Sequence, residues 1–493
     1  MPESLIALDA GTTGVTCLLT DTELRPIARA YREFEQSFPE PGRVEHDSRA
    51  ILDAVDATLA EILAHPQATD VLALGVTNQR ETIFALDPGA GEAIVPGIVW
   101  QDRRTAERCR ELHEAGHGDR IAERTGLRLD PYFSATKIEW MLREQEHLLE
   151  RAEGGGIVFT TVDGLIVQHL TEQEVVAVDP TNASRTMLFD IERRAWDPEL
   201  CDLFGIRPEW LPEVRPSAGD FGMTSPYLVG REIPIRGVAG DQQAALFGQG
   251  GFEAGSFKTT FGTGCFLMLH TGSERRRSEA GFLSTLAVDA GGGPAFALEG
   301  SLFMGGATVQ WLRDGLGLID DAAESEALAR TVADSGGVHL IPAFTGLGAP
   351  YWDPQARGAL LGLTRGTTRA HVVRAALESI ALSSSELIDL LRQETGLPIE
   401  TALVDGGASR NALLLELLAD LGGLTARRPS DVEATARGAA MLAGIGCGRF
   451  ASGNDVPALE LTETGPKLSE SERQDRLEDW RRAVARTLSE GGS

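Results

Sequence analysis

Two stretches of the chain share one pattern: an apolar strand, a turn of glycine and threonine, and an apolar strand that returns beside the first. The first stretch runs from Ser4 to Thr20, with its turn at Gly11-Thr12-Thr13-Gly14, and the second from Phe257 to His270, with its turn at Gly262-Thr263-Gly264. Glycine lets a backbone approach a ligand closely, and neighbouring N–H groups and threonine hydroxyls can cradle phosphate oxygens. One such turn is commonly a plain hairpin. Two of them, one near the start of each half, predict two halves built alike, with the turns facing each other across a phosphate-binding cleft.

Strand-like and helix-like patterns alternate along the rest of the chain, which predicts an α/β architecture. Because 493 residues are too many for one ordinary core, we expect two domains, residues 1–250 and 251–493. Further strands are expected at 71–77 and 82–86, and helices at 371–391, at 411–421 with Asn411 as its N-cap, and near 469–488.

The charge balance and the cysteine pattern narrow the class of protein. The formal net charge is −28, and lysine occurs only at positions 137, 258 and 467, so neither nucleic acid nor an anionic membrane surface is expected as a partner. No run approaches the roughly 18 apolar residues that span a bilayer, and the N-terminus lacks the basic start of a secretory signal. The five cysteines are scattered and form no CxxC pair, which is typical of free thiols in a reducing compartment. We therefore expect a cytoplasmic protein without stable membrane insertion.

A third glycine-rich segment, from Val404 through Asp405-Gly406-Gly407 to Asn411, has the pattern of a strand, a tight turn and a helix start. A helix start without side chains leaves a flat backbone platform beside which a nucleobase or ribose can lie. An ordinary strand–helix connection would have the same pattern. The chain has neither the Walker A pattern nor the GxGxxG fingerprint, so a P-loop NTPase and a dinucleotide enzyme are not indicated. Asp9, at the end of the first strand, is a candidate to face Mg²⁺ through water.

The two Gly/Thr turns and the late Asp-Gly-Gly segment together resemble the actin-like (ribonuclease H-like) ATPase fold, in which two domains flank a nucleotide cleft. The segments between them are similar to the FGGY family of carbohydrate kinases, and within it to the branch that phosphorylates glycerol. This resemblance runs in family order from about Ile6 to about Gly446 and is carried by residues 75–82, 99–105, 132–144, 181–187, 240–248, 342–353 and 358–378.

The resemblance implies transfer of a phosphoryl group from Mg²⁺·ATP to glycerol, which gives ADP and sn-glycerol 3-phosphate. It implies Asp241 as the general base; a polyol site of Arg80, Glu81, Trp100, Tyr132, Asp241, Gln242 and Phe266; a nucleotide site of Thr12, Thr13, Gly14, Thr263, Gly306, Gln310, Gly407 and Asn411; and Mg²⁺ at Asp9 and Asp241. Charged donors and acceptors suit a polyol, because each hydroxyl must exchange its bonds to water for protein partners. ATP and glycerol are the expected partners.

Two alternatives stay open at this point. One is an FGGY kinase of a longer polyol or of a ketose such as xylulose, and the other is a weakly catalytic sensor that binds glycerol and a nucleotide. The sensor is supported by Thr16, which stands where the family usually has a basic residue near the phosphates, so that transition-state charge would be stabilised less. Ala10 and Ala412 also replace residues that are polar in the family. The sequence leaves the oligomeric state open, and relatives are often dimers or tetramers.

Overall fold

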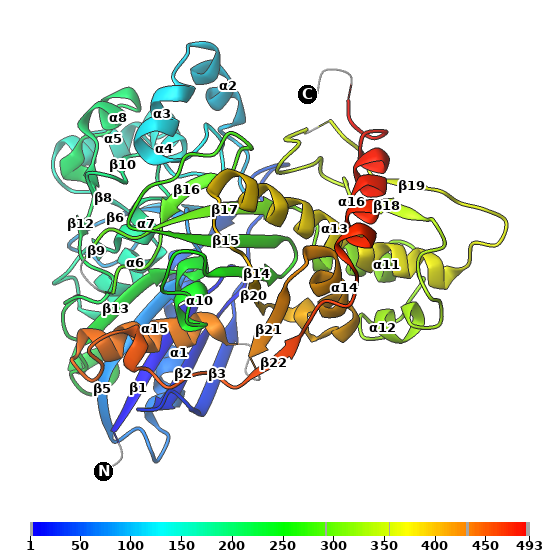
Figure 1. Ribbon diagram of the computed structural model, residues 1–493. Helices are drawn as coiled ribbons and strands as arrows, with labels where there is room; N and C mark the ends of the chain where they lie inside the picture. The colour runs from blue at the N-terminus through cyan, green and yellow to red at the C-terminus, as the bar shows by residue number, and fades with distance from the viewer. Residues whose placement is uncertain (1–2, 291–292, 354, 430–432, 490–493) are drawn as a thin grey trace.

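The computed structural model describes residues 3–290, 293–353, 355–429 and 433–489, and its frame is two large β-sheets with helices on their faces (Figure 1). The first sheet contains, in spatial order, β13 (Ile235–Gly240), β5 (Asp70–Asn78), β1 (Glu3–Ala10), β2 (Gly14–Asp21) and β3 (Pro26–Glu33). β1, β2 and β3 form an antiparallel meander, whereas β5 is parallel to both of its neighbours. The first Gly/Thr turn is the β1–β2 hairpin, as predicted.

The second sheet repeats this plan. Its strands, in spatial order, are β16 (Leu283–Leu286), β17 (Phe296–Leu302), β15 (Cys265–Gly272), β14 (Phe257–Phe261), β20 (Thr401–Asp405), β21 (Thr425–Pro429) and β22 (Leu461–Thr464). From β17 to β21 it matches the first sheet: β14–β15 and β15–β17 are antiparallel, while β14–β20 and β20–β21 are parallel. The second Gly/Thr turn is the β14–β15 hairpin. The predicted α/β class and the two similar halves are confirmed.

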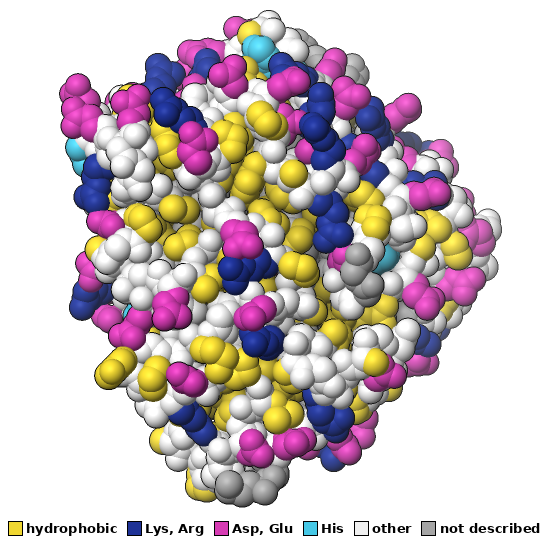
Figure 2. Space-filling model, turned by 90° about the vertical axis from the view of Figure 1, so that its left-hand side faces the viewer, with side chains coloured by type: hydrophobic (Ala, Val, Ile, Leu, Met, Phe, Trp, Pro, Cys, Tyr) yellow, Lys and Arg dark blue, Asp and Glu magenta, His cyan; other side chains and the backbone are white. Residues whose placement is uncertain are grey.

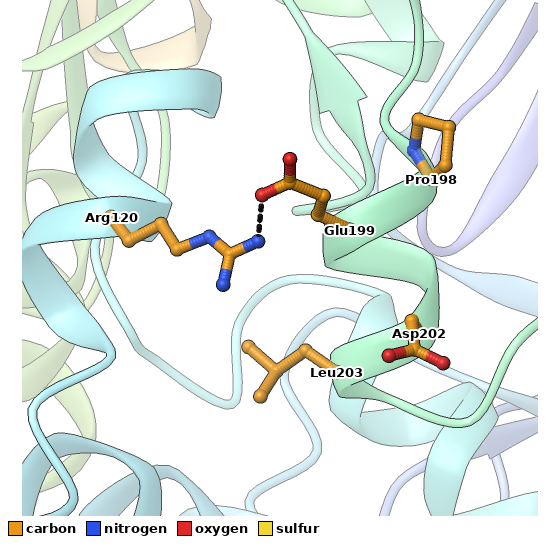
Figure 3. Close-up of a pocket in the computed structure, with 5 residues that line it drawn as sticks. All are labelled: Arg120, Pro198, Glu199, Asp202 and Leu203. Carbon is orange, nitrogen blue, oxygen red and sulfur yellow. Dashed lines mark hydrogen bonds and ion pairs between the residues drawn. The ribbon is translucent and has the colours of Figure 1, made fainter.

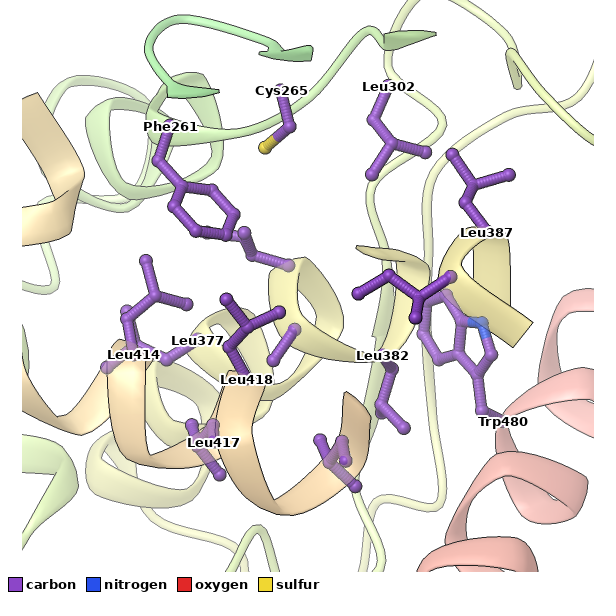
Figure 4. Packing of buried hydrophobic residues seen from close by; sticks show 14 of the residues in the cluster. Phe261, Cys265, Leu302, Leu377, Leu382, Leu387, Leu414, Leu417, Leu418 and Trp480 are labelled. Atoms are coloured by element: carbon purple, nitrogen blue, oxygen red, sulfur yellow. The ribbon is translucent and has the colours of Figure 1, made fainter. Parts of the chain in front are cut away.

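Each sheet has its own covering helices. On the first sheet lie α1 (Ser48–Leu63) and α6 (Val162–Leu170), and on the second α13 (Arg369–Thr395) and α14 (Ala412–Gly422). The predicted N-cap of α14 is confirmed, because the Asn411 side chain accepts the N–H of Leu414 at 3.1 Å. Leucines of α13 and α14 meet Phe261 and Cys265 of the sheet in one continuous apolar core (Figure 4). This core holds the second Gly/Thr turn in place.

Two further helices join the halves. α10 (Asp241–Gly248) follows β13 directly, and α15 (Ala434–Gly446), although it comes late in the chain, packs against α10 and against β1, β5 and β13. The backbones of the two helices touch, because a Cβ at Gly438 would lie only 2.0 Å from the Ala244 carbonyl oxygen. No side chain fits there, so glycine is required at this position.

The remaining elements are insertions around the two sheets. In the first half they are β4 (Glu45–His46), β6 (Ile83–Leu86), β7 (Gly97–Ile98), α2 (Ala106–Glu114), α3 (Gly118–Thr125), α4 (Ala135–Glu144), α5 (Glu146–Glu153), β8 (Val158–Thr161), β9 (Ala177–Val178), α7 (Pro180–Ala183), β10 (Phe189–Asp190), β11 (Ala195–Trp196), α8 (Pro198–Leu203), β12 (Glu213–Val214) and α9 (Pro226–Val229). In the second half they are α11 (Gly306–Asp314), α12 (Glu324–Ala329), β18 (His339–Ile341), β19 (Ala359–Leu361) and α16 (Glu470–Val484). The final helix begins at a capping box formed by Ser469 and Glu472, where the sequence predicts its start.

The surface carries both signs of charge. On the face shown in Figure 2, acidic and basic side chains are interspersed rather than gathered by sign. All five cysteines are free, and four of them are buried. Within the described ranges, no helix combines the length and the apolar composition that crossing a bilayer requires.

His46 makes the stability of the fold sensitive to acid. Its side chain is fully buried at the end of β4, and burial lowers its pKa to about 4. An unfolded histidine has a pKa of about 6.5, so between these values the unfolded chain binds a proton that the folded chain does not. The stability that neutral His46 permits is therefore complete above the unfolded pKa and is lost as the pH falls toward the folded one. We expect a loss of about 2–3 kcal/mol between pH 7.5 and pH 4.5 from this residue.

Urea unfolding of the wild type and of His46→Asn at these two pH values measures this contribution. Carboxylates titrate in both proteins, so only the difference between them reports on His46. The variant should be less stable at pH 7.5 and should lose less stability on acidification. Parallel losses in both proteins would show that His46 is not the group responsible.

Candidate active site

Four almost completely buried charged side chains form one cluster that joins the two halves. Arg80 and Glu81 lie in the turn between β5 and β6, Arg185 follows α7, and Glu299 lies in the middle of β17. Each of the four is at most 3 % exposed. Glu299 lies 2.6 Å from Arg80 Nη1 through one carboxylate oxygen and 2.8 Å from Arg185 Nη2 through the other. Arg185 Nε lies 2.6 Å from Glu81 Oε1, so every buried charge has an opposite partner.

Burial and ion pairing compete over the charge state of the two acids. Burial alone would raise the pKa of Glu299, but Arg185 and Arg80 outweigh it and bring that pKa to about 2. At Glu81 burial prevails over the same two arginines, and its pKa is raised. Glu81 also has a left-handed backbone with φ of 64°, a conformation that costs a non-glycine residue roughly 1–3 kcal/mol. Strain of this kind persists where the surroundings hold a side chain in a required direction.

Asp241 lies at the edge of this cluster. It is the first residue of α10, and its carboxylate remains 30 % exposed. Oδ1 lies 3.3 Å from Arg80 Nε and accepts the N–H of Gln242 at 2.7 Å. Burial raises the pKa of Asp241, against the opposing effects of Arg80 and Lys258. An accessible carboxylate that is fixed by a cation and has a raised pKa is suited to accept a proton from a hydroxyl group.

Asp9 and Asp241 fit a magnesium ion that is shared with a substrate. Burial is the main cause that raises the pKa of Asp9 to about 8, and the negative charge of Asp241 adds to it. Within the described part of the chain, no group of three or more His, Cys, Asp or Glu side chains is arranged to hold a metal ion. Mg²⁺ commonly takes one or two carboxylates and completes its shell with water and phosphate oxygens. Two aspartates are therefore a sufficient protein contribution.

Two of the three predicted polyol aromatics lie together. The ring centroids of Trp100 and Tyr132 are 5.6 Å apart, with the ring planes at 85°. Trp100 Nε1 donates to the hydroxyl of Thr12 at 3.0 Å, which ties the pair to the first Gly/Thr turn. The guanidinium of Arg185 lies 5.8 Å from the centre of the Tyr132 ring, which ties the pair to the charged cluster. Phe266, the third aromatic, is half-buried on β15 in the other half of the chain.

The first Gly/Thr turn is held by its neighbours and has a cation beside it. The carbonyl oxygen of Thr13 accepts the N–H of Phe34 at 3.2 Å, and a Cβ at Gly14 would lie 2.6 Å from a backbone oxygen of β3. Arg29, on β3, donates through Nη2 to the hydroxyl of Thr16 at 3.4 Å. The sequence places no basic residue next to Thr16, but the β2–β3 pairing brings one there.

Three segments of the second half meet at the predicted nucleotide site. Gly306 opens α11 and donates its N–H to the Gly262 carbonyl oxygen at 2.7 Å, and a Cβ at Gly306 would lie 2.8 Å from that oxygen. A Cβ at Gly406, where φ is 85°, would lie 2.5 Å from the Phe261 carbonyl oxygen. The second turn, the start of α11 and the Asp-Gly-Gly segment thus pack backbone to backbone. Gly407 is exposed beside them, and a Cβ there would meet nothing within 4 Å.

The other predicted nucleotide residues differ in how far their side chains are already engaged. Gln310 is exposed on α11. Thr263 lies in the second turn, and its carbonyl oxygen accepts the N–H of Gly305 at 2.9 Å. The carboxamide of Asn411 caps α14, and its Nδ2 donates to Ser325 Oγ at 3.2 Å, so both ends of this amide have protein partners.

Sequence reasoning missed three charged residues of this site: Arg185, Glu299 and Lys258. Arg185 belongs to one of the family-like segments, but its pattern indicates no role. Glu299 is the single charged residue of Phe-Ala-Leu-Glu-Gly-Ser-Leu, and Lys258 is the single charged residue of Phe-Lys-Thr-Thr-Phe. A lone charged residue in an otherwise apolar strand is buried unless one face of the strand is exposed to solvent. Buried charges need partners. That signal could have identified both residues.

A surface hollow of about 360 Å³ lies between α3 and α8, and its lining is Arg120, Pro198, Glu199, Asp202 and Leu203 (Figure 3). An ion pair between Arg120 and Glu199 links the two helices across it. None of the predicted site residues contributes to this lining, so we assign the hollow no part in the chemistry.

Comparison with known proteins agrees with this geometry. The N-terminal domain of the FGGY family of carbohydrate kinases matches residues 4–248, and the C-terminal domain of that family matches residues 257–447. A glycerol kinase of Shewanella pealeana is 48 % identical, covering 98 % of this chain and 99 % of that protein. A glycerol kinase of Thermus brockianus is 51 % identical, covering 98 % of each chain. The crystal structure of Plasmodium falciparum glycerol kinase with ADP superposes with a TM-score of 0.94 at 31 % identity, covering 99 % of both chains.

Proposed function

Because the chain belongs to the FGGY family of carbohydrate kinases, we propose that it transfers the terminal phosphoryl group of ATP to glycerol, giving ADP and sn-glycerol 3-phosphate. The observation that carries this proposal is the match along nearly the whole chain to proteins named glycerol kinase, at 48 % and 51 % identity. The charged cluster supports it, because closely spaced donors and acceptors are what a small polyol needs. We propose the polyol site as Arg80, Glu81, Trp100, Tyr132, Asp241, Gln242 and Phe266.

In the proposed reaction, a hydroxyl oxygen of glycerol forms a bond to the terminal phosphorus of ATP while the bond from that phosphorus to the ADP oxygen breaks. Asp241 accepts the hydroxyl proton on a carboxylate oxygen, and Arg80 holds that carboxylate in place from 3.3 Å. Phosphoryl transfer passes through a loose transition state, so the position of Asp241 contributes as much as its basicity. Closure of the two halves would exclude water, which otherwise competes as the phosphoryl acceptor.

The nucleotide would lie across the two Gly/Thr turns. We propose Thr12, Thr13, Gly14, Thr263, Gly306, Gln310, Gly407 and Asn411 as its contacts; the exposed backbone at Gly407 supports an adenosine platform. Mg²⁺ bound by Asp9, Asp241 and the phosphates would supply positive charge opposite the transferring group. The free cysteines support a reducing, cytoplasmic location.

Release of ADP with Mg²⁺·ATP tests the proposal against glycerol, dihydroxyacetone, erythritol, xylulose and ribulose. We expect glycerol to give the highest kcat/KM. If xylulose or another longer substrate turns over while glycerol does not, the chain is a different FGGY kinase. If ATP and glycerol both bind but no substrate turns over, the sensor alternative is correct.

Arg29 is expected to assist the phosphates from beside Thr16. Its guanidinium lowers the pKa of Asp9 against the larger effect of burial, so its charge is felt at the proposed metal residue. The side chain is 47 % exposed, and solvent screening therefore limits its effect to about 1 kcal/mol or less. We expect Arg29→Met to raise the KM for ATP about two- to fivefold while the KM for glycerol stays unchanged.

Arg32→Met provides the matched control. Arg32 lies on the same strand, is 48 % exposed, and pairs with Glu61 rather than with the turn. Steady-state kinetics should show wild-type constants for this variant. Equal effects of the two substitutions, or no effect of either, would mean that Arg29 does not reach the phosphates.

A further inference from the structure

Lys258 is a buried cation in a chain that has almost no lysine. The sequence contains three lysines, and Lys258 is 0 % exposed within β14 of the second sheet. Burial of an ammonium group costs several kcal/mol unless it is paired and hydrogen-bonded. The surrounding residues must therefore compensate this charge.

The side chain of Lys258 makes two hydrogen bonds, one within its own strand and one to the other half of the chain. Nζ donates to the side-chain oxygen of Gln242 at 2.8 Å and to the hydroxyl of Thr260 at 2.5 Å. Thr260 lies two residues along the same strand and therefore on the same face, opposite Asp405 in the β14–β20 register. Gln242 belongs to α10 in the other half, so this contact joins the two halves beside Asp241.

The contact fixes which end of the Gln242 amide is free. Lys258 Nζ donates to Gln242 Oε1 at 2.8 Å, so the oxygen of the amide points toward Lys258. Its NH₂ group then faces away from Lys258 and can only donate. The carboxylate of Asp241, the preceding residue, already accepts the Gln242 N–H at 2.7 Å and supplies an acceptor. The two neighbours together offer one acceptor and one donor.

We propose that Lys258 is a positioning residue that locks the Gln242 amide as a hydrogen-bond donor toward the polyol. The proposal rests on the function given above and adds a determinant of specificity to it. A hydroxyl group both donates and accepts, so the Asp241–Gln242 pair recognises a hydroxylated substrate only while the amide keeps this orientation. Without Lys258 the amide oxygen keeps only the long hydrogen bond from Thr260 Oγ1 at 3.5 Å, so the amide can rotate and present its oxygen, which duplicates the acceptor that Asp241 already provides.

Lys258→Met tests whether Lys258 orients the Gln242 amide. Lys467→Met is the matched control, because Lys467 is exposed. Glycerol dissociation constants by calorimetry in the presence of ADP are measured beside kcat and both KM values. We expect Lys258→Met to weaken glycerol binding about tenfold, as loss of one well-placed hydrogen bond does, and to change the KM for ATP by less than about twofold. In a Gln242→Leu background the same substitution should weaken glycerol binding by less than about twofold, since the residue it acts through is gone.

Gln242→Glu gives a second test that keeps Lys258 and should keep the fold, because a carboxylate can pair with the ammonium. It removes the donor, so glycerol binding should again fall about tenfold or more. The inference is overturned if Lys258→Met has the same effect in both backgrounds, if it moves the KM for ATP instead, or if Gln242→Glu binds glycerol normally. Failure of the wild type to bind or phosphorylate glycerol would overturn the proposed function itself, which is a separate outcome.

Discussion

Asp241→Asn is expected to keep the fold and to lower kcat by about 10²–10⁴-fold, the range that a general base contributes. The amide matches the carboxylate in shape but cannot accept the hydroxyl proton. Arg80 loses the negative charge 3.3 Å away yet keeps Glu299 at 2.6 Å, so the buried cluster remains paired. The Asp241 carboxylate is partly exposed and burial raises its pKa, so its removal should leave the unfolding temperature within a few degrees of the wild type. Turnover of ATP with saturating glycerol is the measurement.

Asp202→Asn is the matched control, because Asp202 is an exposed helix carboxylate at the hollow between α3 and α8. It should have wild-type kcat. Glycerol binding to Asp241→Asn, measured by calorimetry, separates loss of chemistry from loss of substrate. A kcat within about tenfold of wild type would show that Asp241 positions the substrate but does not act as the base.

Much of the fold follows from local pattern. Three features lie where the sequence predicts them: the strand 257–261, the cap at Asn411 and the start of the last helix at Ser469. Hydrophobic period and capping chemistry are local signals, so they can be recognised in the sequence. The path of α15 could not be predicted in this way. It belongs to the predicted second domain, 251–493, but packs on the first sheet, and its sequence contains no sign of which sheet it covers. The limits 1–250 and 251–493 therefore stay a prediction.

In the candidate site too, local sequence pattern identifies some residues, and only the tertiary fold identifies the others. Arg80, Glu81 and Asp241 could be proposed because they stand in recognisable segments, and the structure brings them together. Two other charged residues come from strands whose pattern is otherwise apolar: Glu299 lies 219 residues from its partner Arg80, and Lys258 lies 16 residues from its partner Gln242. The cation near Thr16 could not be predicted for a similar reason, because Arg29 reaches Thr16 only through the β2–β3 pairing. Pairing across sheets and halves is a tertiary property, and a single sequence does not display it.

Glu299→Ala is expected to lower the free energy of unfolding by about 3–5 kcal/mol, the usual cost of removing one partner from a buried ion pair. Glu299 is the acid that both Arg80 and Arg185 contact, at 2.6 and 2.8 Å, and its pKa of about 2 shows that the arginines outweigh the cost of its burial. Without it, two buried guanidinium groups share Glu81 and the partly exposed Asp241. Urea unfolding of the variant and the wild type measures the loss.

Glu463→Ala is the control, because Glu463 also pairs with an arginine across the same sheet but is 55 % exposed. Its loss should be about 0–1 kcal/mol. Addition of Arg185→Met to Glu299→Ala should recover part of the stability, since it removes one of the uncompensated charges. A loss below about 1 kcal/mol for Glu299→Ala, or no recovery in the double variant, would mean that water enters and solvates the arginines.

Loss of the Glu299 carboxylate should also affect substrate binding, because of where Glu299 lies in the chain topology. Glu299 belongs to β17 of the second sheet, whereas Arg80 and Arg185 belong to the first half, so one carboxylate anchors both arginines to the opposite half. Arg80 contacts Asp241 and Arg185 contacts Glu81, which are the proposed base and a proposed polyol residue. Glu299→Gln keeps the size of the side chain and should remain folded, so it isolates this effect. We expect it to raise the KM for glycerol more than the KM for ATP. Equal changes in both constants would indicate a general loosening of the halves instead of a directed effect on the polyol site.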